Sequence, residues 1–207
     1  MRTYVFIDAS NLFYGGRKSL GWNIDYKKLA EYFKNRYGAT KIYYFGGVEI
    51  HNFPYDYIKE EVVSVKLVAK YLIRYLDENN KGLRSSRIAS IKYYLRKIRF
   101  YMNLEEFGYD LILKPVKIHI DIDGVFQKKA NCDVDITLFL LRYMDHFDRV
   151  IVLSGDGDFL PVLKYLRENK KEVLVFARSR GTAREIKQFV GGEFINFESI
   201  RIYIEYR

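Results

Sequence analysis

The sequence predicts an α/β fold, a three-layer α/β/α arrangement around a mostly parallel central sheet. The first observation is a set of short apolar runs rich in β-branched and aromatic residues, typical of buried strands, at 3–7, 41–48, 149–153 and 172–177. The second is a set of helical segments between these runs, at 24–37, 135–147 and 159–169. Because parallel strands need crossover connections, this alternation indicates helices on both faces of a parallel sheet.

The first elements follow this pattern closely. The strand at 3–7 ends at Asp8, and the segment 24–37 places Leu29, Tyr32, Phe33 and Tyr37 on one stripe of a helix. The next strand, at 41–48, completes the first β–α–β unit. Ligands of such sheets bind beyond the carboxyl ends of the strands, so Asp8 falls where a site is expected.

Residues 55–107 interrupt the alternation. Their apolar residues recur at steps of three and four, in two series separated by a polar turn at 78–82. The members are Val65, Val68, Ala69, Leu72 and Leu76, then Ile88, Ile91, Leu95, Ile98 and Met102. This spacing predicts a helical hairpin inserted into a single domain that spans residues 1–207.

Two later segments alternate between apolar and polar residues, as strands do. Residues 116–122 alternate and are followed by Asp123-Gly124, a turn signal that predicts a β-hairpin returning through 125–129. The segment 200–206 also alternates, and both a terminal strand and a short helix remain open there.

The composition excludes several classes of protein. A single cysteine, Cys132, excludes a disulfide scaffold and a zinc site made only of thiolates. No stretch approaches the roughly 18 apolar residues of a membrane span, and the apolar run at the N-terminus is too short for a signal peptide. We therefore expect a soluble, cytoplasmic protein.

The net charge of +9 indicates an anionic partner if it is concentrated in one place. Residues 59–99 contain eleven Lys and Arg against four Asp and Glu, a surplus of seven, and tyrosines are interleaved with the bases. Basic helices can follow phosphates while tyrosines stack on unpaired bases. The expected nucleic-acid contacts are Arg84, Arg87, Arg96 and Arg99, with Lys128, Lys129, Arg178 and Arg180 beside the site. A solvated helix face or a dimer seam is the alternative.

Aspartates gather at three predicted strand or helix ends, as Asp8, as Asp133 with Asp135, and as Asp156 with Asp158. Clustered carboxylates repel one another unless a cation neutralises them. Oxygen ligands without His or Cys select Mg²⁺ or Mn²⁺. Two residues apart on a helix, Asp133 and Asp135 point in different directions. We expect Asp135 to be a ligand and Asp133 to support it or to cap the helix, while helix capping is also the alternative role of Asp158.

Three motifs in this order resemble the NYN domains, including the LabA-like proteins, within the PIN-like nuclease superfamily. They are Phe6-Ile7-Asp8-Ala9-Ser10-Asn11-Leu12, Lys129-Ala130-Asn131-Cys132-Asp133-Val134-Asp135 and Val152-Leu153-Ser154-Gly155-Asp156-Gly157-Asp158-Phe159-Leu160-Pro161. The resemblance implies a PIN-like fold and a divalent-metal ribonuclease. It implies that Asp8, Asp135, Asp156 and Asp158 bind metal or position water, and that Asn11 and Ser154 orient them.

The first hypothesis is therefore a metal-dependent nuclease acting on RNA, preferentially single-stranded, although the residues themselves do not distinguish RNA from DNA. The family often has a further acid where this chain has Leu140 and Leu141. That departure motivates a second hypothesis, a non-catalytic RNA-binding or regulatory module whose helical hairpin is a partner or homodimer interface. A haloacid-dehalogenase-type phosphatase is disfavoured, because its chemistry needs an acid two residues after Asp8, where this chain has Ser10.

Overall fold

The computed structural model describes residues 1–10, 12, 21–79, 82–120 and 126–206, with the side chains of 118–120 and 126–129 outside the description. The chain forms two compact units. Unit 1 comprises residues 1–45, 107–110 and 132–207, and unit 2 comprises 46–106 and 111–131. Among the described residues, no helix is long and apolar enough to cross a membrane.

The central sheet has six strands in the order β3-β2-β1-β6-β7-β8. Their bounds are β1 Thr3–Asp8, β2 Ala39–Val48, β3 Asp110–Pro115, β6 Arg149–Leu153, β7 Glu172–Ala177 and β8 Phe194–Asn196. The pairs β1–β2, β1–β6, β6–β7 and β7–β8 are parallel. The predicted α/β fold with a mostly parallel sheet is therefore confirmed.

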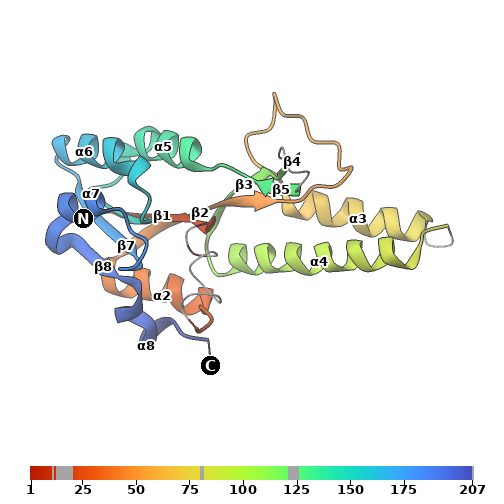
Figure 1. The fold of residues 1–207 in the computed structure, drawn as a ribbon, viewed down its shortest axis with the longest axis horizontal. Coiled ribbons are helices and arrows are strands. Elements are labelled where there is room, and N and C mark those ends of the chain that lie inside the picture. The colour runs from red at the N-terminus through yellow and green to blue at the C-terminus, as the bar shows by residue number, and fades with distance from the viewer. Residues whose placement is uncertain (11, 13–20, 80–81, 121–125, 207) are drawn as a thin grey trace. The chain divides into compact units, whose positions relative to one another are not determined.

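Helices cover both faces of the sheet in unit 1. Figure 1 shows α5 and α6 on one side of the strands and α2 and α8 on the other. Their bounds are α2 Tyr26–Tyr37, α5 Asp133–Arg142, α6 Leu160–Glu168, α7 Arg184–Val190 and α8 Arg201–Ile204. Short 3-10 turns accompany them as η1 Met144–His146, η2 Gly157–Phe159, η3 Gly191–Glu193 and η4 Phe197–Ile200.

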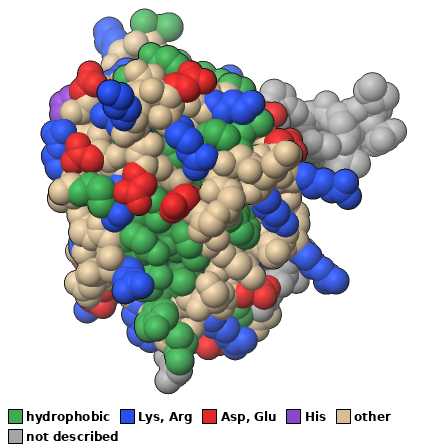
Figure 2. Space-filling model, turned by 90° about the vertical axis from the view of Figure 1, so that its left-hand side faces the viewer, with side chains coloured by type: hydrophobic (Ala, Val, Ile, Leu, Met, Phe, Trp, Pro, Cys, Tyr) green, Lys and Arg blue, Asp and Glu red, His purple; other side chains and the backbone are tan. Residues whose placement is uncertain are grey.

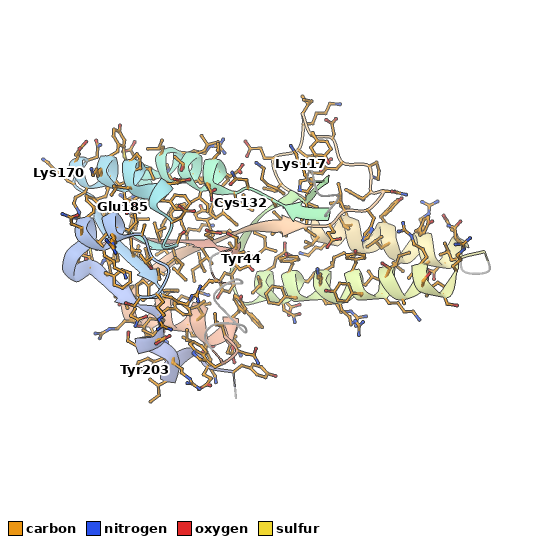
Figure 3. All side chains as sticks on the ribbon, viewed as in Figure 1. Tyr44, Lys117, Cys132, Lys170, Glu185 and Tyr203 are labelled. Atoms are coloured by element: carbon orange, nitrogen blue, oxygen red, sulfur yellow. The ribbon has the colours of Figure 1, made fainter. Side chains whose placement is uncertain are left out.

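Alternating side chains of β2 build the two cores. Phe45 packs against Phe139 of α5, with 5.4 Å between ring centroids. Tyr44, labelled in Figure 3, turns to the other side and packs against Tyr26 of α2 at 6.1 Å. Because neighbouring residues of a strand point to opposite faces, a continuous apolar run is what a sheet covered on both sides requires.

Helix α2 begins and ends at residues typical of helix caps. The Asp25 carboxylate accepts a hydrogen bond from the Lys28 N–H at 3.1 Å. Gly38 follows the helix with a φ of 63°, a left-handed conformation that glycine adopts without steric cost.

In unit 2, the predicted helical hairpin consists of α3 Val65–Asn79 and α4 Ser85–Glu106, which run side by side in Figure 1. The predicted apolar stripes form its core, where Val68, Leu72, Ile91 and Ile98 are buried. The strands β4 Lys117–Ile120 and β5 Phe126–Lys129 pair antiparallel, as predicted, while the turn expected at 123–124 lies outside the described residues.

One predicted element differs in the structure, and at the C-terminus the structure has the short helix, one of the two alternatives left open. The helix expected at 135–147 spans Asp133–Arg142, because Tyr143 leaves the helical conformation and the chain continues as η1. The C-terminal segment forms η4 and α8 rather than a strand. Ile200 and Ile204 are buried while Ile202 is 70% exposed, so one helical face is covered by the core.

Candidate active site

The site begins at Asp8, the last residue of β1. The Asp8 side chain is buried, at 4% exposure. Its Oδ1 accepts hydrogen bonds from the Ser10 backbone N–H at 2.9 Å and the Ser10 hydroxyl at 2.6 Å. Its Oδ2 accepts one from the Ser154 hydroxyl at 3.2 Å. These donors offset the cost of burying a carboxylate and fix its orientation.

The strand register explains why Ser154 reaches Asp8. Ile7 of β1 is the neighbour of Leu153 of β6 in the parallel pair. The next residues along these strands, Asp8 and Ser154, therefore leave the sheet side by side. Ser154 thus makes a hydrogen bond to an aspartate, while its role in orienting a metal ligand stays a prediction.

The acidic loop after β6 is connected to the same hydroxyl. The Asp156 N–H donates to Ser154 Oγ at 3.3 Å. The Asp156 carboxylate accepts from the Asp158 N–H at 3.0 Å and caps η2. The capping role considered for Asp158 thus belongs to Asp156. Both carboxylates are exposed, unlike that of Asp8.

The third pair of acids lies in the first turn of α5. The helix begins at Asp133, and its N-cap is Cys132 without a side-chain capping bond. The capping alternative for Asp133 is therefore wrong. Asp133 and Asp135 are both half-buried. The helix α5 packs against β1 and η2, the elements that carry Asp8 and Asp158.

A basic loop packs against the acidic one. The Ala183 N–H donates to the Gly155 carbonyl at 2.9 Å. The Thr182 hydroxyl donates to the Arg178 carbonyl, which closes the loop 178–182 that follows β7. Arg178 and Arg180 therefore lie in a loop that leads to the contact with Gly155, and their position beside the acids stays a prediction. Arg180 is exposed and Arg178 half-buried.

The structure adds one acid that the sequence did not indicate. Glu185 lies in the first turn of α7 and is labelled in Figure 3. Its Oε1 occupies the space that a Cβ on Gly157 would need, and Ala183 Cβ would lie 3.3 Å from that Cβ. Glycine between two aspartates is the sequence signal for such a close approach, although it does not reveal which residue approaches.

The other predicted site residues are not part of this arrangement in the described structure. Asn11 lies outside the described residues. For Lys128 and Lys129 the backbone is described, in β5, but the side chains are not. Arg87, Arg96 and Arg99 belong to α4 and Arg84 precedes it, all in unit 2.

The acids that the structure describes do not form a preassembled metal cage. Among the described residues, no group of three or more His, Cys, Asp or Glu side chains is arranged to hold a metal ion. The assignment of Asp8, Asp135, Asp156, Asp158 and Asp133 as ligands therefore stays a prediction. The bonded series that the structure does contain runs from Asp8 through Ser154 to Asp156 and Asp158.

The chain is similar in sequence and in fold to known proteins. "Low amplitude and bright protein LabA" from Synechococcus elongatus is 25% identical over 208 residues, covering 99% of this chain and 88% of that protein. A solved protein of unknown function from Vibrio parahaemolyticus is similar with a TM-score of 0.55 and 19% identity, covering 92% of this chain and 89% of that one.

A bacteriophage T5 5′-exonuclease solved with zinc bound gives a TM-score of 0.44 and 14% identity. That match covers 90% of this chain and 60% of the exonuclease. The model of the NYN domain matches residues 48–198, most of the chain. The likeness to the Vibrio protein supports the fold, and the domain match supports the family. The chain belongs to the NYN domain family.

Proposed function

We propose that this protein is a divalent-metal-dependent ribonuclease that hydrolyses phosphodiester bonds of RNA, preferentially single-stranded. The observation that carries the proposal is the hydrogen-bonded series Asp8, Ser154, Asp156 at the carboxyl ends of β1 and β6. An oriented, buried carboxylate beside two exposed ones lies beyond the carboxyl ends of neighbouring parallel strands, where ligands bind in such sheets. Membership of the NYN family supports the same function.

The donor set fits Mg²⁺ or Mn²⁺. All five aspartates offer hard oxygen ligands, and Asp8 is already oriented by three hydrogen bonds. Mg²⁺ commonly uses one or two carboxylates together with waters and substrate phosphates, so a cage of three acids is not required. Asp8 and Asp156, with Asp135 and Asp158, would hold the ion. When bound, such an ion supplies an activated water and offsets charge on the phosphate.

The residues of the chain have separable tasks in this proposal. Ser154 orients the Asp8 carboxylate and holds the backbone of Asp156 in the same place. Arg178 and Arg180 lie in the loop that contacts Gly155, where guanidinium groups can bind the phosphates beside the scissile bond. The exposed position of Asp156 and Asp158 leaves them accessible to water and substrate.

The test measures cleavage of a labelled single-stranded RNA with Mg²⁺ or Mn²⁺, by wild type and by Asp8→Asn and Asp156→Asn. The matched control is Asp145→Asn, because Asp145 is an exposed acid of η1 that precedes β6, at the opposite end of that strand from Asp156. We expect the first two variants to lose metal-dependent cleavage and the control to keep it. Equal cleavage by all four proteins would refute the proposal, and a DNA strand of the same sequence tests the preference for RNA.

A second candidate function is a non-catalytic RNA-binding or regulatory module. It is favoured by one observation, that the described residues form no group of three potential metal ligands. In this case the protein binds RNA with salt-sensitive affinity, yet no metal ion produces turnover.

The helical hairpin as a homodimer interface is tested by light scattering, which measures the mass of the protein in solution. Helix α3 exposes two apolar side chains that a second copy could cover, Leu67 at 53% and Ile73 at 51%.

A further inference from the structure

A groove on the helical hairpin combines apolar and basic side chains. It lies in unit 2, has a volume of about 600 Å³, and is lined by Leu76 of α3 and by Ala89, Lys92, Leu95, Arg96 and Arg99 of α4. Leu76 and Leu95 are half-buried, and the three basic residues are exposed. The groove therefore offers an apolar lining with cations at its opening.

The three basic residues share one face of α4. Positions 92, 96 and 99 follow the spacing of four and three that brings side chains together on a helix. At a rise of 1.5 Å per residue, Lys92 and Arg99 are about 10 Å apart along the helix axis. Like charges at this spacing repel one another, so a bound anion is favoured.

Three other bases of the hairpin are compensated by acids. Arg74 pairs with Glu78 at 2.6 Å, Lys66 with Glu105 at 3.1 Å, and Lys97 with Glu49 at 3.5 Å. By contrast, no acid in the described part of the chain forms an ion pair with Lys92, Arg96 or Arg99. The groove therefore gathers three bases that no described acid compensates, while Lys70, Arg84 and Arg87 are further bases of the hairpin outside its lining.

Another face of the molecule carries mixed charges rather than a cluster of bases. Figure 2 views the side of unit 1 that carries α6, α7 and β8 in Figure 1, and there Lys and Arg side chains are interspersed with Asp and Glu around a hydrophobic area. On that face the basic residues do not gather in one place. An anion is therefore attracted more specifically to the groove than to that face.

We infer that the groove binds single-stranded nucleic acid, with phosphates on Lys92, Arg96 and Arg99 and unpaired bases against Leu76 and Leu95. This inference rests on the proposed function, which makes RNA the substrate. A single strand presents anionic phosphates and apolar base faces together, whereas a duplex keeps its base faces stacked inside. At about 3.4 Å per stacked nucleotide, the 10 Å between Lys92 and Arg99 covers about three nucleotides.

The experiment measures binding of a fluorescent single-stranded RNA to the full chain by anisotropy in EDTA, where metal-dependent cleavage is absent. The main variant carries Lys92→Gln, Arg96→Gln and Arg99→Gln together, and Arg96→Gln alone is the graded variant. The control is Arg74→Gln, which removes a charge from the same hairpin that Glu78 already compensates. All these side chains are exposed, and melting curves verify that the variants fold.

The expected size of the effect follows from counterion release. Each phosphate contact of a single strand contributes about 0.7 to the slope of log affinity against log salt, so the triple variant lowers the slope by about 2. If all variants bind RNA equally at 1 M salt, a slope lower by about 2 makes the triple variant bind about 100-fold more weakly than wild type at 0.1 M salt. By the same reasoning, Arg96→Gln binds about 5-fold more weakly. Leu95→Ser weakens binding of the single strand without changing the slope, and Arg74→Gln changes neither.

Three outcomes overturn the inference. The first is a triple variant that binds RNA like wild type, and the second is tighter binding of a duplex than of the single strand. The third is tighter binding of a polyglutamate peptide than of the RNA, which would indicate that the groove binds an acidic protein. Failure here is distinguishable from failure of the nuclease proposal, because Asp8→Asn should abolish cleavage while keeping this binding. RNA binding by the groove without any metal-dependent cleavage refutes the nuclease proposal alone.

Discussion

Removing the Ser154 hydroxyl should destabilise the fold and disorient Asp8. Ser154→Ala deletes the bond at 3.2 Å to the Asp8 carboxylate and the acceptor at 3.3 Å for the Asp156 N–H. A hydrogen bond to a charged group contributes about 1.5–3 kcal/mol to stability. For a chain of this size, that loss corresponds to a melting temperature about 3–12 °C lower.

Ser10→Ala is the matched control for this change. It removes a hydroxyl from the other oxygen of the same carboxylate, but Ser10 is exposed and its N–H still donates to that oxygen at 2.9 Å. We therefore expect a free energy of unfolding within about 0.5 kcal/mol of wild type. The contrast between the two serines compares the loss of a buried hydroxyl that makes two hydrogen bonds with the loss of an exposed hydroxyl that makes one, at the same carboxylate.

Urea denaturation followed by the fluorescence of Trp22 measures both changes. Trp22 is buried in unit 1 and stacks on Phe197 at 6.2 Å between ring centroids, so its emission reports the unfolding of that unit. Under the nuclease proposal, Ser154→Ala also lowers cleavage about 10- to 100-fold, as changes to residues that orient ligands do. Equal destabilisation by the two serine variants, or none by Ser154→Ala, would contradict the argument.

Three further predictions test packing and pH dependence. Gly155→Ala places a Cβ 2.6 Å from Thr182 Oγ1 and 3.0 Å from Thr182 Cα, so urea denaturation should show a loss of about 1–3 kcal/mol. Leu72→Ala in the hairpin core, where Leu72 is 2% exposed, should cost about 2–5 kcal/mol in the same measurement. Burial raises the pKa of Tyr26 from 10.0 to about 12. The unfolded chain therefore loses this proton first, and stability measured by circular dichroism should fall as pH rises from about 10 to about 12.

Each of these has an outcome that would contradict it. Gly155→Ala at wild-type stability means that the loop at Thr182 moves away without cost. A loss below about 1 kcal/mol for Leu72→Ala means that the hairpin closes over the cavity. A Tyr26→Phe variant serves as the control at high pH. If its decline between pH 10 and 12 matches that of wild type, the burial of Tyr26 does not set the alkaline limit.

The strands were predictable because a strand that is buried on both faces consists of a continuous run of apolar residues. Runs such as Arg149–Leu153 and Glu172–Ala177 agree with the structure to the residue. Helix ends were less predictable. The apolar pattern of α5 continues to Phe147, yet the helix ends at Arg142, because Phe147 is buried from the extended segment that follows η1. Periodicity records which residues are buried, not the backbone that buries them.

The site shows the same limit at the level of atoms. The sequence indicates that Asp8, Asp156 and Asp158 follow strands, but it does not reveal that Asp156 caps η2. Glu185 was missed because it approaches Gly157 from a helix 28 residues further along the chain, through a contact that leaves no spacing pattern. Cap geometry and such close approaches depend on backbone angles and on packing between elements.

By itself, the sequence determined the class of fold, the positions of the acids at strand ends and the basic surplus of the hairpin, because each is a property of local pattern and composition. Tertiary structure decided which of these residues meet. Ser154 bonds to Asp8 across 146 residues because β1 and β6 are neighbours in one parallel register. On the hairpin, it separated the bases that acids compensate from those that line the groove. Both outcomes depend on distances of a few ångströms between distant segments, and only the folded chain sets those distances.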